Sequence, residues 1–174
     1  MRRAREFFYS GRMSRHPTRN VAAILERQAV ESRWASHRWS LVAVVPDEGG
    51  GARTLVEDAT TLRRLHPGLE LALYPDEAEG YFLNVDSGVP SVFVVLRTDE
   101  ASGEPYAFQA TLSYNEAARW MDANERVERV PAWADLARWM DEWVAANYRP
   151  EPRKPSRPRS FVGKEGRLRK EGSR

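Results

Sequence analysis

The residues with the clearest capacity for chemistry lie at 33–39, where the sequence reads Arg-Trp-Ala-Ser-His-Arg-Trp. Two tryptophans, two arginines and one histidine meet there, at the start of an expected strand. A guanidinium stacked on an indole makes a platform for a planar or anionic group. The alternative is that Trp39 belongs to the core and the arginines only surround it. The candidate partner-binding residues in this segment are Arg33, Trp34, His37 and Arg38.

Other groups that could carry a reaction are less specific. The carboxylates of Asp76, Glu77 and Glu79 could hold a hard cation or transfer protons, but a solvated turn explains them as well. The three histidines lack the spacing of a zinc site. Residues 21–149 contain no lysine, which excludes a phosphate-binding loop and a Schiff base there. The sequence therefore predicts no catalytic residue and no metal ligand, and an enzyme would need a pocket joining His37 to a buried carboxylate.

A second set of tryptophans lies towards the end of the apolar part of the chain. Residues 132–147 place apolar side chains at helical spacing, and the stripe is wide enough to dock on a sheet. Trp133, Trp139 and Trp143 are therefore expected in the core. An exposed Trp133 or Trp120 would instead mark a docking surface. On this ground Trp133 is a further candidate for partner binding.

The elements that must position these residues follow from periodicity. Strands are predicted at residues 21–30, 37–46, 69–74, 80–85 and 125–130, with a hairpin formed by residues 91–98 and 105–112. Residues 54–65 fit either a strand or a short helix. Ser113 and Glu116 form a capping box that begins a helix ending near residue 122, and a second helix follows at 132–147. The predicted fold is α+β, a mainly antiparallel sheet or partly open barrel backed by two C-terminal helices.

The charge is distributed in three blocks that also suggest the domain organisation. The first twenty residues carry +5, residues 21–149 carry −9, and residues 150–174 carry +6. We interpret residues 1–19 as a basic arm, 20–149 as one α+β domain, and 150–174 as a basic tail rich in proline and arginine. Both arms are expected to be disordered until a partner orders them. Candidate contacts in the tail are Arg157, Arg159 and Phe161.

The basic arms leave two alternatives open. Arginines bind phosphates, so the arms could bind a nucleic acid with an affinity that falls steeply with salt. The excess of arginine over lysine could instead reflect a biased coding composition. The absence of cysteine excludes disulfides and thiolate clusters from this chain. Without an apolar run of membrane-spanning length or a secretory signal, a cytoplasmic protein away from the membrane is expected.

Several residues spread along the chain carry a resemblance to a known family. The most specific are Tyr81, Asn84 and Pro90, then the run Val-Val-Leu-Arg at 94–97, and finally Glu116-Ala117 and Val130-Pro131. In these residues, and over about residues 20–150, the sequence resembles the bacterial family DUF3305. Members are often encoded beside molybdenum- or tungsten-dependent formate dehydrogenases and their maturation proteins.

The resemblance implies a role but no reaction. It suggests a non-catalytic accessory factor or small subunit of such a formate dehydrogenase, with the catalytic subunit as its partner. No cofactor is predicted for the chain itself. The segment at 33–39 is a weaker candidate for holding an anionic cofactor, such as the pterin dinucleotide. A nucleic-acid-binding protein that uses its basic arms is the alternative.

Overall fold

A computed structural model describes residues 16–152, which contain seven strands, three α-helices and one short 3-10 helix. The first four strands are β1 (Thr18–Ala29), β2 (His37–Pro46), β3 (Arg53–Glu57) and β4 (Thr61–Ala72). The 3-10 helix η1 (Pro75–Glu77) and helix α1 (Ala78–Asp86) follow. The remaining elements are β5 (Ser91–Thr98), β6 (Pro105–Thr111), α2 (Tyr114–Asp122), β7 (Arg126–Pro131) and α3 (Ala134–Asn147).

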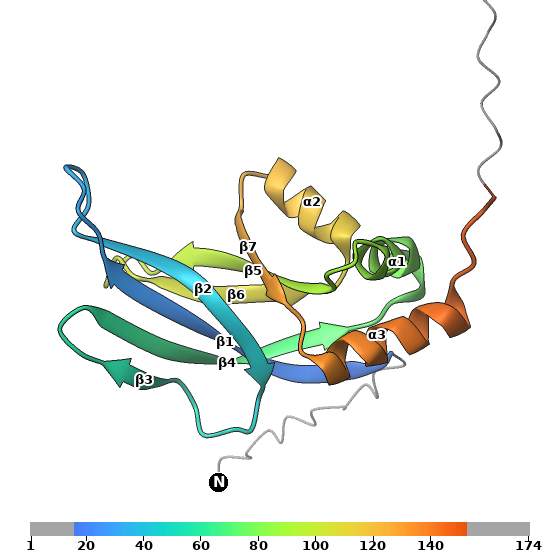
Figure 1. Ribbon diagram of the computed structural model, residues 1–174, viewed down its shortest axis with the longest axis horizontal. Helices are drawn as coiled ribbons and strands as arrows, with labels where there is room; N and C mark the ends of the chain where they lie inside the picture. Colours follow the sequence, from blue (N-terminus) through green and yellow to red (C-terminus); the bar gives the residue numbers. More distant parts are fainter. Residues whose placement is uncertain (1–15, 153–174) are drawn as a thin grey trace, which may run out of the picture.

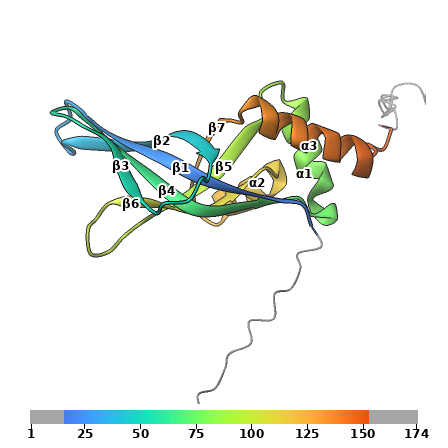
Figure 2. The ribbon, with the colours of Figure 1, turned by 90° about the horizontal axis from the view of Figure 1, so that it is seen from below.

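The strands form two antiparallel sheets, which confirms the predicted α+β class. One sheet has the order β2-β1-β4-β3 and the other the order β6-β5-β7. The sheets face each other, with β2 beside β7 and β4 beside β6 (Figure 1). No hydrogen-bonded ladder joins these neighbours within residues 16–152, so the sheets do not close into one barrel. The three α-helices gather at one end of the molecule, and the strand hairpins extend towards the other (Figures 1 and 2).

The hydrophobic core lies between the two sheets and is closed by helix α3. Alternate residues of β1 and β5 point inwards, as the two-residue repeat of a strand requires. Helix α3 adds Leu136, Met140 and Val144, which share one face because they are four residues apart. The inward side chains of the two central strands are Val21, Ala23, Leu25, Val92, Val94 and Leu96.

Side chains of β7 join β2 to β7 where backbone pairing is absent. The carboxylate of Glu128 accepts a hydrogen bond of 2.7 Å from the backbone N–H of Leu41 on β2. It also pairs with Arg126, whose guanidinium donates to the carbonyl of Trp39 at 2.6 Å. An edge strand exposes unpaired backbone groups of this kind, and two of them on β2 are thus satisfied.

The prediction of a strand at residues 80–85 is wrong, because these residues lie in helix α1. Gly80 disfavours a helix, and the aromatic and branched side chains that follow it favour a strand. The glycine is required by packing instead. A Cβ atom at Gly80 would lie 2.1 Å from the Oγ of Ser113, so only glycine lets α1 approach the start of α2 this closely. The carboxylates at 76–79, expected in a turn, fall in η1 and the first turn of α1.

The structure resolves the ambiguous segment and agrees with most of the other predicted elements. The ambiguous residues 54–65 are strands β3 and β4, separated by a turn in which Asp58 accepts from the backbone N–H groups of Thr60 and Thr61. The predicted hairpin of residues 91–98 and 105–112 is confirmed as β5 and β6, and β6 ends one residue earlier than predicted. One half of the predicted capping box is confirmed, since the Ser113 hydroxyl accepts from the N–H of Glu116 at 3.1 Å. The other half does not form, because the N–H of Ser113 donates to Thr111. Helix α1 is an additional helix beyond the two expected at the C-terminal end.

We expect Glu128→Ala to lower the free energy of unfolding by about 1–3 kcal/mol, because it leaves the buried N–H of Leu41 without an acceptor. Glu128→Gln should cost less, since the amide oxygen can still accept this bond. Urea denaturation of both variants measures the difference. Glu142→Ala, an exposed change on α3, is the control and should stay within about 0.5 kcal/mol of the parent protein. Equal stability of Glu128→Ala and this control would show that the contact does not hold β2 to β7.

Candidate functional site

The loop between β1 and β2 presents an almost fully exposed tryptophan. We call residues 30–38 the hairpin tip. Trp34 is 95% exposed there, although the loop around it has defined contacts. The N–H of Val30 donates to the carbonyl of Ser36 at 3.1 Å, and the N–H of Trp34 donates to the Ser32 hydroxyl at 3.3 Å. The sequence candidates Arg33, Trp34, His37 and Arg38 are all exposed on this tip.

Arginines do stack on Trp39, but they come from outside the predicted segment 33–39. Trp39 is half-buried and packs against the core, as the alternative interpretation held. The guanidinium carbons of Arg27 on β1 and Arg64 on β4 lie 5.9 Å and 5.8 Å from its ring centroid. Both are close enough for a cation–π interaction. Sequence reasoning missed them because neighbouring strands supply them.

The structure does not place His37 in a pocket with a buried carboxylate. Its Nδ1 lies 2.8 Å from the hydroxyl of Ser36, and the ring is exposed. The buried acid of β1, Glu26, pairs with Arg63. Within residues 16–152, no three His, Asp or Glu side chains gather as a metal site requires.

The remaining sequence candidates lie elsewhere. Trp133 is half-buried against the core at the start of α3, so it does not form an exposed docking surface. Trp120 is also half-buried and lines a groove between β4 and β6. The predictions for Arg157, Arg159 and Phe161 fall outside the described residues, as do most residues of the two basic arms.

A groove of about 350 Å³ runs between the C-terminal halves of β4 and β6. We call it the seam groove. Two carboxylates, Glu70 and Glu116, line it together with three aromatic side chains, and none of its lining residues is basic. The aromatic side chains are Tyr74, Phe108 and Trp120. Sequence reasoning missed this site because β4 and β6 are far apart in the chain.

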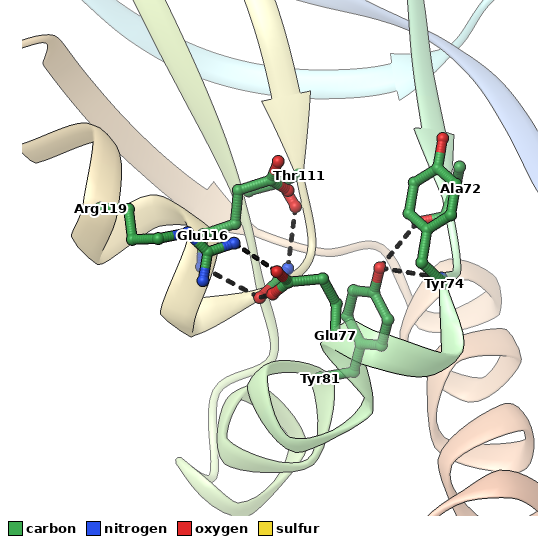
Figure 3. Close-up of polar contacts among 8 residues, drawn as sticks. Ala72, Tyr74, Glu77, Tyr81, Thr111, Glu116 and Arg119 are labelled. Atoms are coloured by element: carbon green, nitrogen blue, oxygen red, sulfur yellow. Dashed lines mark hydrogen bonds and ion pairs between the residues drawn. The ribbon is translucent and has the colours of Figure 1, made fainter.

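A hydrogen-bonded network lies at the helix end of the seam groove (Figure 3). The hydroxyl of Ser113 donates to Glu77 at 2.5 Å, and Glu77 pairs with Arg119 on α2. The backbone N–H of Ser113 donates to Thr111 Oγ1 at 3.0 Å. A capping box would have given that N–H to Glu116, so the carboxylate of Glu116 is left to line the groove.

Tyr81 on α1 bonds to the end of β4 beside this network (Figure 3). Its hydroxyl donates to the carbonyl of Ala72 and accepts from the N–H of Tyr74, both at 3.1 Å. Burial is the main cause that raises the pKa of Tyr81 to about 12, and the carboxylates of Glu116 and Glu77 add to the effect. The hydrogen bond from Tyr74 acts in the opposite direction. Tyr81 is therefore a neutral structural link at physiological pH.

The residues behind the family resemblance are mainly structural. Asn84 is 1% exposed and donates to the carbonyls of Ser91 and Leu112, at 2.7 Å and 2.8 Å, while its oxygen accepts from the N–H of Ser91. Tyr81 and Val94 are also fully buried. These positions specify the fold and do not by themselves indicate a reaction.

The fold and these two surfaces define a small antiparallel α+β protein with an exposed aromatic loop and an acidic groove. The chain belongs to the family DUF3305, described as a protein of unknown function, whose model matches residues 20–157. The comparisons with curated proteins and with solved structures each gave no match. In the described part of the chain, no helix has the length and apolar character needed to cross a bilayer.

We expect Tyr81→Phe to lower the free energy of unfolding by about 1–3 kcal/mol at pH 7, because two part-buried backbone groups lose their hydrogen-bond partner. In the parent protein the unfolded tyrosine ionises near pH 10 and the folded one only near 12, so stability falls as pH rises between them, by about 1.4 kcal/mol per pH unit. Tyr81→Phe has no phenol at this position, so its stability does not fall with pH for this reason. Urea denaturation at pH 7, 10 and 11 should therefore show the stability difference narrowing above pH 10.

Tyr106→Phe is the matched control, because Tyr106 is exposed on β6. It should leave both the stability at pH 7 and its alkaline decline nearly unchanged. A difference between Tyr81→Phe and the parent protein that stays constant from pH 7 to 11 would contradict the raised pKa.

Proposed function

We propose that this protein is a non-catalytic binding module of a molybdenum- or tungsten-dependent formate dehydrogenase system. It acts in the cytoplasm as an accessory factor or small subunit and binds the catalytic subunit. The partner is suggested by the genes that often accompany members of the family. The observation that carries the proposal is the exposure of Trp34 at the hairpin tip.

Exposing an indole to water is unfavourable in the isolated protein, whereas burying it against a partner would stabilise a complex. Burying a large aromatic side chain removes much apolar surface from water, which stabilises the buried state. Tryptophan and arginine are the residues most enriched among those that dominate binding energy at interfaces. The hairpin tip supplies both types, with Trp34 between Arg33 and Arg38.

The charge of the hairpin tip indicates the partner surface it would fit. Two arginines and one acid, Glu31, give the loop a net positive charge. A partner pocket that accepts the indole and carries carboxylates at its rim is complementary to it. The same loop is a weaker candidate for an anionic cofactor, because its arginines do not stack on either tryptophan of the segment.

We expect Trp34→Ala to reduce recovery of the formate dehydrogenase catalytic subunit with the tagged protein in its own host by more than tenfold. A hot-spot residue contributes about 2 kcal/mol or more, and 1.4 kcal/mol corresponds to tenfold in affinity. Mass spectrometry of the material purified with the tagged protein measures the recovery. Tyr106→Ala, which removes an exposed aromatic residue on β6, is the matched control and should leave it unchanged.

The outcomes distinguish the alternatives. Recovery in constant proportion at moderate salt identifies a permanent subunit, whereas weak recovery that Trp34→Ala abolishes identifies an accessory factor. Absence of the dehydrogenase from the parent sample would overturn the proposal. Recovery of RNA or DNA that is lost when residues 150–174 are removed would favour the nucleic-acid-binding alternative.

A further inference from the structure

The seam groove separates two strands that each have one open edge. Strand β4 pairs with β3 only through residues 62–65, so beyond them its edge away from β1 has no ladder partner among the described strands. Within residues 16–152, strand β6 pairs only with β5. Open strand edges of this kind bind extended segments through backbone hydrogen bonds.

The hydrogen-bonding pattern shows which groups of β4 face the groove. The N–H of Leu73 donates to the carbonyl of Pro17, next to β1. Bonded positions alternate in an antiparallel ladder, so Leu71 also bonds towards β1, while Ala72 and Glu70 direct their backbone groups the other way. Tyr81 already uses the carbonyl of Ala72. The backbone groups of Glu70 are thus available to a segment lying in the groove.

The side chains around the groove favour a basic occupant. Glu70 and Glu116 supply negative charge without a basic residue in the lining. The rings of Tyr74 and Trp120 provide faces to which a guanidinium is attracted. Arginine combines these properties, since it pairs with carboxylates and stacks on aromatic rings.

The chain enters the described fold at the same place. The ring of His16 lies 4.8 Å from that of Tyr74, which lines the groove. The fifteen preceding residues hold five arginines and one glutamate. Fully extended, they reach roughly 50 Å, far more than the few residues of β4 that border the groove. We infer that residues 1–15 of this chain bind in the seam groove, as an extended segment beside β4.

The test uses the complete chain, which contains no cysteine, so an introduced cysteine is the only site for a thiol-reactive label. A nitroxide on Ser10→Cys should strongly reduce the indole N–H signal of Trp120 in NMR spectra. The signal of Trp34 should keep its intensity, because the loop between β1 and β2 that holds it lies at the end of the molecule away from the helices (Figure 1). Raising sodium chloride from about 0.05 M to about 0.5 M should restore much of the Trp120 signal, because salt screens the charge pairing.

A charge variant tests the groove itself. Glu70→Gln combined with Glu116→Gln keeps side-chain size and the cap from Ser113 to the backbone of residue 116, so the fold should be retained. The same label should then reduce the Trp120 signal much less. A spectrum of the double variant that matches the parent at the other tryptophans verifies the fold.

Three results would overturn the inference. Equal signals of Trp120 and Trp34 in the labelled protein would show that residues 1–15 do not occupy the groove. Loss of the Trp120 signal in an isotope-labelled chain mixed with a nitroxide-labelled one would assign the groove to a second copy. A larger effect from a nitroxide on Ser160→Cys would assign it to the C-terminal segment. Because none of these results involves the hairpin tip, they do not affect the proposed function.

Discussion

The position of the helices relative to the sheets depends on the hydrogen bonds of Asn84. This side chain on α1 links the start of β5 to the residue after β6, and its amide also lies 3.7 Å from the sulfur of Met140 on α3. Both the amide and the carbonyl oxygen of Asn84 are therefore engaged inside the core. A buried amide with satisfied bonds selects one arrangement, since any shift of α1 would leave polar groups unpaired. The close contact at Gly80 fixes the same helix against the start of α2.

With the three helices fixed in this way, the two sheets face each other without a continuous ladder of hydrogen bonds. They meet along two lines of contact, β2 beside β7 and β4 beside β6, and these two contacts differ. Between β2 and β7, Glu128 and Arg126 satisfy backbone groups of β2 and bring the strands together. Between β4 and β6, the pair formed by Arg64 and Glu104 is placed near the hairpin end. Towards the helices, the strands separate into the seam groove. The groove therefore follows from how the sheets are held rather than from a loop added to the fold.

The parts of the fold that the sequence predicted are those with local causes. The hairpin of β5 and β6 and the cap at Ser113 depend on residues close together in the chain. Local propensity predicts a strand where helix α1 lies, because the glycine at position 80 is required by a tertiary contact that the local sequence does not show. Of the candidate site, the exposed loop around Trp34 could be found from its composition. The seam groove could not, since β4 and β6 share no sequence signal that they lie side by side.

The distribution of charge gives the two surfaces different chemistry. Helices α1, α2 and α3, with η1, carry more acids than arginines, and the seam groove opens next to this end. The hairpin tip is basic and lies at the other end (Figure 1). Charges separated by much more than a Debye length scarcely interact at physiological salt. A basic segment held in the groove would therefore neutralise the acidic end without competing for the hairpin tip. Both surfaces can then be occupied at once, so binding in the groove need not inhibit binding at the tip.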